Sequence, residues 1–416
     1  MKHNLVSIGM GYGLALAILH LILDWLHPEV VHDEAYHMDM ARAYFAGKLR
    51  YWNGMITTPP GLYISSLLLY FPFSLIGMVW ENAKVPLSAL RMTSVAFAWL
   101  LTYFLSSMYL GRMIQAAESA AEILDGAERE RKYQQLGPHP VFVLTCPLIV
   151  LYSQVYYTDV GSLLLVFLGY RLLQVSEVLA STIINLVALS FRQTNIIWIA
   201  YGVASVIGPP KDPRVVLNRR IRPALISVAF AFLFLWLNRW SIVLGDHLHH
   251  QFSLHPEQLL YFGLFLSLTV PFLIPWSNFG SADFLASYMF ALIMMTYSTE
   301  PHPYNVTDPL HLAYWFIKLP YKEVLLGVFG YWALKSLFLH CLALWGWWET
   351  MALAGATMLS LVTNGLVEPR YYLPAMFMCM LRLPVPSITR ARLQFQWNVL
   401  LCTVCFTLLV TRGVLF

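Results

Sequence analysis

Two adjacent acidic residues follow the first long apolar run of the chain, in the segment His32-Asp33-Glu34-Ala35-Tyr36-His37. A carboxylate at the boundary of an apolar layer is partly desolvated, and desolvation raises its pKa. A raised pKa suits a general base that works near neutral pH. Asp33 and Glu34 are therefore candidate catalytic residues, and His37 is a candidate substrate contact. Acids in an ordinary surface loop are the simpler alternative.

Two further motifs place ionisable groups where apolar runs meet. In Tyr156-Tyr157-Thr158-Asp159-Val160-Gly161 the acid stands between two such runs, where it either binds substrate or begins a helix by accepting from the first backbone N–H groups. In Phe191-Arg192-Gln193-Thr194-Asn195 an arginine and an amide lie between two short runs. A cation at mid-bilayer depth costs about 2.5–3.5 kcal/mol. Arg192 therefore pairs with an anion or lines a wet cavity, with snorkelling to the interface as the alternative.

Two polar segments further along carry additional candidate substrate contacts. Asp246 lies in a histidine-rich segment, Gly245-Asp246-His247-Leu248-His249-His250, whose loose spacing favours polar contacts over a metal site. His302, Asp308 and His311 lie beside aromatic residues, a combination that suits sugar stacking. Aromatic residues also mark membrane interfaces, which is the alternative explanation.

The last motif is Glu368-Pro369-Arg370-Tyr371, at the start of a late apolar run. The forked guanidinium of Arg370 matches the geometry of a phosphate. We expect Glu368, Arg370 and Tyr371 to contact substrate, and a salt bridge between Glu368 and Arg370 is the structural alternative.

The composition indicates the environment in which these motifs work. Of the 416 residues, 58% are hydrophobic and 12% are charged, whereas a soluble domain carries about 25% charged residues. The chain is therefore expected to be an all-α polytopic membrane protein with the lipid bilayer as its partner. Nucleic acid is excluded because no basic patch with interleaved aromatics occurs. The five cysteines lie in or beside apolar runs and are expected to be buried thiols.

Apolar runs recur along the whole chain, which predicts a single integral domain over 1–416. A spanning helix needs about 20 apolar residues, and we expect about 13 spans. The segment 60–80 is broken by Gly61, Pro72 and Gly77, so it spans or lies as a re-entrant or interfacial helix. The other runs are 4–26, 88–110, 139–156, 160–176, 178–191, 195–208, 223–244, 258–275, 283–298, 322–342, 344–363, 370–384 and 394–412.

The distribution of basic residues predicts which connectors face the cytosol. If 60–80 does not cross the membrane, the basic connectors 111–137, 208–222 and 382–393 lie on one side, and basic loops are cytosolic. The opposite, lumenal side then collects the polar motifs. These include a catalytic loop within 27–80 that carries short interfacial helices, and the sequon Asn305-Val306-Thr307.

Five of these motifs, in the same order, resemble the family of dolichyl-phosphate-glucose-dependent α-1,2-glucosyltransferases, which belong to the GT-C superfamily. The resemblance extends from about 30 to 385. Relatives tend to have Asp-Asn-Arg-His where this chain has Asp308-Pro309-Leu310-His311, so the arginine of that loop is missing here. The motifs are Asp33-Glu34 with Met55-Ile56-Thr57-Thr58-Pro59-Pro60-Gly61-Leu62-Tyr63, Tyr156–Gly161, Phe191–Trp198, Gly245-Asp246 and Glu368–Tyr371.

The resemblance implies a multi-pass enzyme of the endoplasmic reticulum membrane whose active site faces the lumen. The donor would be dolichyl-phosphate glucose, and the acceptor the Glc2Man9GlcNAc2 oligosaccharide on dolichyl diphosphate. A β-linked donor that gives an α-1,2 product reacts with inversion, which needs one base and no covalent intermediate. Asp33 would be that base, with Glu34 orienting it or substituting for it. Arg370, with Arg192, would stabilise the leaving phosphate. No metal or other cofactor is expected.

Two alternatives stay open at the level of sequence. One is another polyprenyl-phosphate-sugar transferase of the GT-C superfamily, for mannose or an earlier glucose. The other is a transporter or channel regulator without catalysis. The second alternative predicts inverted repeats and ionisable residues along a pore, whereas here the ionisable residues gather at one face.

Overall fold

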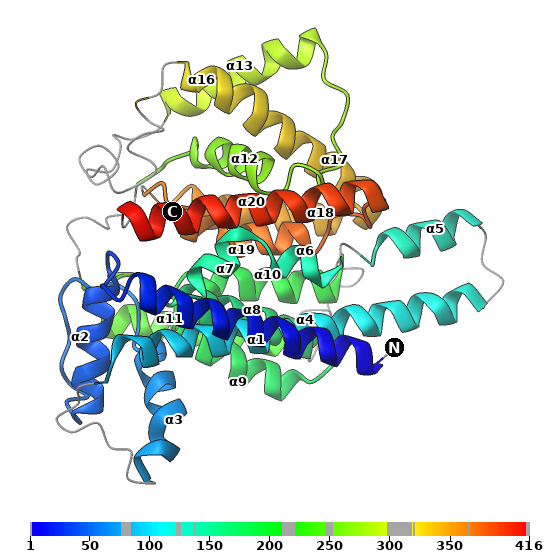
Figure 1. Ribbon diagram of the computed structural model, residues 1–416. Coiled ribbons are helices and arrows are strands. Elements are labelled where there is room, and N and C mark those ends of the chain that lie inside the picture. Colours follow the sequence, from blue (N-terminus) through cyan, green and yellow to red (C-terminus); the bar gives the residue numbers. More distant parts are fainter. Residues whose placement is uncertain are drawn as a thin grey trace. The chain divides into compact units, whose positions relative to one another are not determined.

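The regular structure of the described residues is entirely helical. The computed structural model describes residues 2–75, 85–121, 126–136, 139–209, 221–245, 253–297, 318, 321–364 and 366–412. Within these residues the secondary structure consists of α-helices, one π-helical segment and short turns (Figure 1). The predicted all-α class is confirmed for this part of the chain.

The described residues form two compact units, each made of two stretches of sequence. One unit lies within Met1–Phe104 and Ile149–Gln251, and the other within Leu105–Leu148 and Phe252–Phe416. They are described separately as the first and second unit. The single domain expected over 1–416 stays a prediction.

The first unit carries the predicted acidic loop. α8 packs against both α9 and α10, α11 packs against α9 and α10, and α2 packs against α3. A small core beneath α2 and α3 includes Met40, Tyr44 and Tyr63 together with Tyr156 and Phe191 from later segments. The helices of this unit are α1 (Lys2–Leu26), α2 (Glu34–Phe45), α3 (Gly61–Leu75), the start of α4 (Leu87–Ala121), the end of α7 (Pro147–Tyr152), α8 (Asp159–Gln174), α9 (Val178–Leu189), α10 (Asn195–Ile207) and α11 (Arg222–Leu237).

Glycines determine how closely the helices of the first unit approach and where one of them ends. A Cβ on Gly169 of α8 would lie 2.0 Å from the Asn185 side-chain oxygen on α9, so the two helices touch at this point. The Ser181 hydroxyl donates to the Gly169 carbonyl across the same contact, at 2.8 Å. Gly208 ends α10 with φ +73, a left-handed conformation that glycine adopts without steric cost.

The second unit contains the remaining helices. α12 packs against η4, α17, α18 and α19, while α6 packs against α20. The segments α16, η4 and α17 are continuous, and η4 is π-helical. The helices are the rest of α4, α5 (Gly126–Gln134), α6 (Pro140–Leu144), the start of α7, α12 (Gln258–Thr269), α13 (Ser281–Thr296), α16 (Lys322–Leu325), η4 (Leu326–Tyr331), α17 (Trp332–Trp345), α18 (Trp347–Leu361), α19 (Pro369–Met380) and α20 (Ile388–Arg412).

The helices support a membrane protein and correct one predicted span. Among the described residues, Leu87–Ile114, Leu326–Trp345 and Ile388–Thr411 are long and apolar enough to cross a bilayer, and seven further apolar helices have 10–17 residues. The total of about 13 spans stays a prediction. The run 139–156, predicted as one span, is wrong as a single helix. It divides into α6 and α7, because Pro147 at the start of α7 has no N–H to continue the ladder.

The contact between α12 and η4 yields a stability prediction. A Cβ on Gly263 would lie 2.2 Å from the Gly330 carbonyl oxygen, so neither backbone can yield without moving a helix. We expect Gly263→Ala to destabilise the protein by about 1–3 kcal/mol, as overpacked sites do. A thermal melt in detergent measures the effect.

Gly355 on α18 is the matched control for this prediction. A Cβ there meets nothing within 4 Å, so Gly355→Ala should be neutral or should stabilise the helix by roughly 0.5–1 kcal/mol. Equal thermal midpoints for the two variants would contradict the close backbone contact.

Candidate active site

The acidic loop is shaped by a tight turn immediately before α2. His32 adopts φ +48, which is unusual for a residue other than glycine, and reverses the chain. The Glu34 N–H donates to the Val31 carbonyl at 3.0 Å. Asp33 immediately precedes α2, and its carbonyl accepts from the N–H groups of Tyr36 and His37. The Asp33 side chain is half-buried and does not cap the helix.

Glu34 points into the protein and is completely buried. The guanidinium of Arg91, on α4, donates hydrogen bonds to both oxygens of the Glu34 carboxylate. Nε lies 2.9 Å from Oε1 and Nη2 lies 2.7 Å from Oε2. Two backbone N–H groups complete the shell, that of Val31 at 3.1 Å and that of Tyr156 at 2.8 Å. The Glu34 carboxylate therefore accepts four hydrogen bonds, two of them from a cation.

The two neighbouring acids therefore have different surroundings. An ionised carboxylate has about four lone-pair sites, and the four donors around Glu34 occupy them. Glu34 is thus poorly suited to accept a proton from a substrate. Asp33 immediately precedes the helix and is half-buried, whereas Glu34 is completely buried. The geometry fits an orienting role for Glu34 better than a substituting one.

Arg91 is a functional candidate that the sequence reasoning missed. It is 3% exposed and also donates to the carbonyls of Glu29, at 2.7 Å, and His27, at 3.4 Å. Asp24 near the end of α1 lies 3.9 Å away. The available signal was an arginine just inside the apolar run 88–110, because a cation there needs a partner.

His37 lies one helical turn after Asp33 and is held by two tyrosines. Its Nδ1 lies 2.7 Å from the Tyr63 hydroxyl oxygen, at hydrogen-bond distance. The centre of its ring lies 5.9 Å from that of Tyr63 and 5.4 Å from that of Tyr157. The Tyr157 hydroxyl in turn donates to the Val31 carbonyl at 3.3 Å. The connection between α1 and α3, residues 27–60, is called the first loop here. Near Asp33 it therefore contacts Tyr63 of the motif at 55–63 and Tyr157 of the motif at 156–161.

The exposed side of α2 carries another carboxylate, Asp39. It accepts from the Tyr51 hydroxyl at 2.8 Å and from the Asn53 amide at 2.9 Å. The hydrogen bond from the Tyr51 hydroxyl to Asp39 raises the pKa of Tyr51, because ionisation of the tyrosine would remove the donated proton. Asp39 thus braces the loop that follows α2, from a position open to solvent.

The motif at 191–195 closes the other end of the first loop. The Gln193 amide donates to the Thr57 carbonyl at 2.8 Å, and the Gly61 N–H donates to the Ser190 carbonyl at 2.7 Å. A Cβ on Gly61 would lie 2.6 Å from both Phe191 and the Ser190 oxygen, so only glycine fits this position. In the structure Gln193 supports the loop that leads into α3.

Arg192 and Asp159 form a buried ion pair within the first unit. Nη2 of Arg192 lies 2.9 Å from Oδ1 of Asp159, and its Nε donates to the Thr158 hydroxyl at 3.1 Å. Asp159 is 3% exposed and is the first residue of α8, where its charge also favours the helix dipole. Each group already has the other as its counter-ion. Their predicted contact with substrate stays a prediction.

In the second unit the predicted motif before α19 also forms an ion pair. Nε of Arg370 contacts Oε2 of Glu368, and the Arg370 guanidinium lies 5.3 Å from the centre of the Tyr371 ring. Glu368 is 6% exposed and immediately precedes α19. The structure therefore contains the salt bridge that the sequence allowed as an alternative. The predicted substrate contacts of this motif stay predictions.

The other predicted contacts lie outside the described residues. They are Asp246, His302, Asp308 and His311. Within the part of the chain that the structure describes, no three His, Cys, Asp or Glu side chains lie close enough to hold a metal ion.

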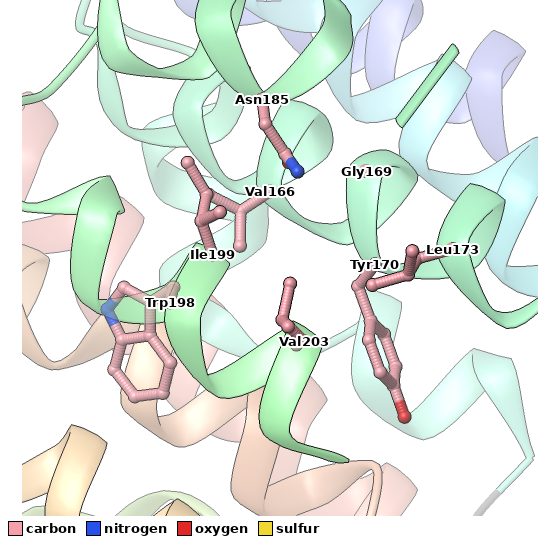
Figure 2. A pocket seen from close by; sticks show the side chains of 9 residues that line it. Val166, Gly169, Tyr170, Leu173, Asn185, Trp198, Ile199 and Val203 are labelled. Carbon is pink, nitrogen blue, oxygen red and sulfur yellow. The ribbon is translucent and has the colours of Figure 1, made fainter. Parts of the chain in front are cut away.

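A shallow pocket between α8, α9 and α10 contains none of the predicted site residues. Figure 2 shows Tyr170 and Trp198 at its sides and Asn185 at its polar edge. The wall is otherwise aliphatic, and the Asn185 amide lies within reach of the Ser181 hydroxyl on the same helix, at 3.4 Å. The pocket belongs to the packing of these helices. Its lining residues are Val166, Gly169, Tyr170, Leu173, Asn185, Trp198, Ile199, Gly202 and Val203.

Comparisons with known proteins connect this geometry to one family. A family model described as the DIE2/ALG10 family matches residues 27–210 and 210–381, which include both ends of the first loop and the ion pairs Asp159–Arg192 and Glu368–Arg370. No solved structure matches the chain.

Curated relatives from fungi and mammals share one name, Dol-P-Glc:Glc(2)Man(9)GlcNAc(2)-PP-Dol alpha-1,2-glucosyltransferase. The Candida albicans protein is 26% identical over 381 residues, which cover 82% of this chain and 81% of the relative. The Mus musculus protein is 23% identical over 417 residues, covering 86% and 85%. The Kluyveromyces lactis protein is 25% identical over 70% of this chain, and the chain spans 56% of that relative.

The buried pair of Asp159 and Arg192 yields a prediction about stability. Asp159→Ala leaves a buried cation without its counter-ion, which typically costs about 3–5 kcal/mol. The double variant Asp159→Ala, Arg192→Met removes both charges and should recover most of the lost thermal stability. Melting curves of the two single variants and the double variant test this expectation. Additive losses would show that the pair is not a coupled structural unit.

Proposed function

The chain belongs to the DIE2/ALG10 family, and from that premise we propose that it transfers glucose from dolichyl-phosphate glucose to Glc2Man9GlcNAc2 on dolichyl diphosphate. The product linkage is α-1,2, as in the names of its curated relatives. The enzyme is a multi-pass protein of the endoplasmic reticulum membrane with the GT-C architecture, about 13 spans and a lumenal active site. The basic connectors and the apolar helices support this placement.

The observation that carries the proposed chemistry is the contrast between the two adjacent acids. Asp33 acts as the base, because Glu34 is buried and its oxygens are already bonded to Arg91 and to two backbone N–H groups. The Asp33 carboxylate takes the proton from the acceptor hydroxyl as the hydroxyl oxygen attacks the anomeric carbon of glucose. The bond from that carbon to the phosphate oxygen breaks at the same time, and dolichyl phosphate leaves with its electron pair. One displacement inverts the anomeric centre.

The leaving group needs charge stabilisation but no proton, because a phosphate monoester is already a good leaving group. The proposed contacts of this phosphate are Arg192 and Arg370. A guanidinium carries five N–H donors, so a bond to one carboxylate does not exhaust it. His37, Asp159, Gln193, Asp246, His302, Asp308, His311, Glu368 and Tyr371 complete the proposed set of substrate contacts.

The reaction itself is tested with purified protein and defined acceptors. Dolichyl-phosphate glucose is supplied with synthetic lipid-linked oligosaccharides that carry no, one or two glucoses. We expect transfer only to the diglucosylated acceptor, and linkage analysis of the product should show a new α-1,2 bond. Transfer to a different acceptor would favour another GT-C transferase. Absence of transfer to any acceptor would favour a non-catalytic membrane protein.

The role of Asp33 is tested by removing only its charge. A positioned base contributes typically 10²–10⁴-fold, so Asp33→Asn should lower kcat by about that factor at unchanged thermal stability. Asp39→Asn is the matched control, because Asp39 is an exposed carboxylate on α2, the helix that Asp33 immediately precedes. We expect the control to keep near-normal turnover. Near-normal turnover of Asp33→Asn would remove Asp33 from the mechanism.

A further inference from the structure

We propose that Arg91 is a positioning residue for the transfer reaction, acting on Asp33 through Glu34. This inference rests on the proposed function, in which Asp33 is the base. Arg91 does not touch the reacting atoms. Its effect on the reaction follows from the backbone that it holds in place.

Arg91 is the centre of a network that joins three separate parts of the first unit to α4. It bonds the Glu34 carboxylate at the start of α2, and Glu34 in turn accepts from Tyr156 N–H before α8. It also bonds the carbonyls of His27 and Glu29 in the loop after α1. The bonds to Glu34 are buried, and those to the two carbonyls are partly buried. Together they fix the loop on both sides of the turn that presents Asp33.

The turn itself needs such support. His32 has φ +48, a conformation that residues other than glycine rarely adopt and that persists only where the surroundings enforce it. Asp33 lies between this residue and the anchored Glu34, so its Cα is held from both neighbours. If the anchor loosens, the turn can relax and carry the Asp33 carboxylate away from its working position. A misplacement of 1 Å can cost about 10²-fold in rate.

The shape of the arginine matters as well as its charge. A guanidinium bonds both carboxylate oxygens in one plane and still reaches the carbonyl of Glu29, at 2.7 Å. A lysine carries the same charge on a single nitrogen and cannot reproduce this fork. Arg91→Lys therefore keeps the charge balance of the buried site while removing the geometric constraint on Glu34.

The second unit offers a matched control pair that lies beside no proposed base. Arg382 is 2% exposed, and its Nε donates to Glu349 at 2.8 Å. Its guanidinium also lies 4.7 Å from the centre of the Trp345 ring. Both arginines are almost fully buried, while Glu349 is 9% exposed and Glu34 is fully buried. Arg382→Lys should therefore reproduce the cost in stability of replacing a buried, ion-paired arginine, without the effect on catalysis.

The experiment places Arg91→Lys and Arg382→Lys in the wild-type chain and in Asp33→Asn. It measures kcat, KM and the thermal midpoint with dolichyl-phosphate glucose and the diglucosylated acceptor. In the wild-type chain we expect Arg91→Lys to lower kcat by about 10²-fold with little change in KM. In Asp33→Asn the same change should lower the residual rate by less than about 2-fold, because residues that act as a unit are not additive. Arg382→Lys should lower only the thermal midpoint.

A second variant guards against misfolding of Arg91→Lys. Glu34→Gln is nearly isosteric and weakens the same anchor from its other side, so it should give the same pattern of kcat loss. The inference is overturned if either variant keeps normal kcat, if KM rises while kcat stays constant, or if the rate falls equally in the Asp33→Asn background. A wild-type protein that transfers no glucose would instead overturn the proposed function, which separates the two failures.

Discussion

The buried contact between Glu34 and Arg91 is the constraint on which the first unit depends. Burying two charges costs several kcal/mol per ion unless hydrogen bonds replace the lost water. Here the carboxylate has four donors, and the guanidinium reaches two backbone carbonyls in addition. Satisfying both ions requires the loop after α1, the start of α2, α4 and the segment before α8 to converge. The position of Asp33 is a consequence of that convergence.

Buried pairs of an arginine and a carboxylate also occur elsewhere in this chain, which has few charged residues. Asp159 pairs with Arg192 at the start of α8, and Glu349 pairs with Arg382 in the second unit. In each case the arginine bonds a carboxylate within its own unit, and Arg382 also lies over the Trp345 ring. Among the described residues, buried arginines thus join segments distant in sequence, which suits a protein whose helices face lipid and gain little from hydrophobic contact with each other.

Apolar runs predicted the helices well where each run was continuous. The runs 160–176, 178–191 and 195–208 correspond to α8, α9 and α10 within a few residues. The prediction of a single helix over 139–156 was wrong because hydropathy takes no account of the N–H group that Pro147 lacks.

The sequence did not predict in which direction the side chains of Asp33 and Glu34 point. Adjacent helical residues project about 100° apart, so only one of Asp33 and Glu34 can face Arg91, and the pattern does not say which. Arg91 itself escaped notice because its partner lies 57 positions away in the chain. Only the two hydrogen bonds from Arg91 to Glu34 in the structure connect Arg91 with the candidate site.

The two ends of the first loop also determine where the protein can change. Glu34 secures the beginning, and the Gly61 N–H bonded to the Ser190 carbonyl secures the end. Between them, the residues from Ala46 to Arg50 form an exposed tip. Exposed tips between fixed ends accept insertions most readily, and lengthening a loop adds little to its closure entropy. Insertions at this tip can therefore change what the loop contacts outside the protein while Asp33, near the start of the loop, keeps its position.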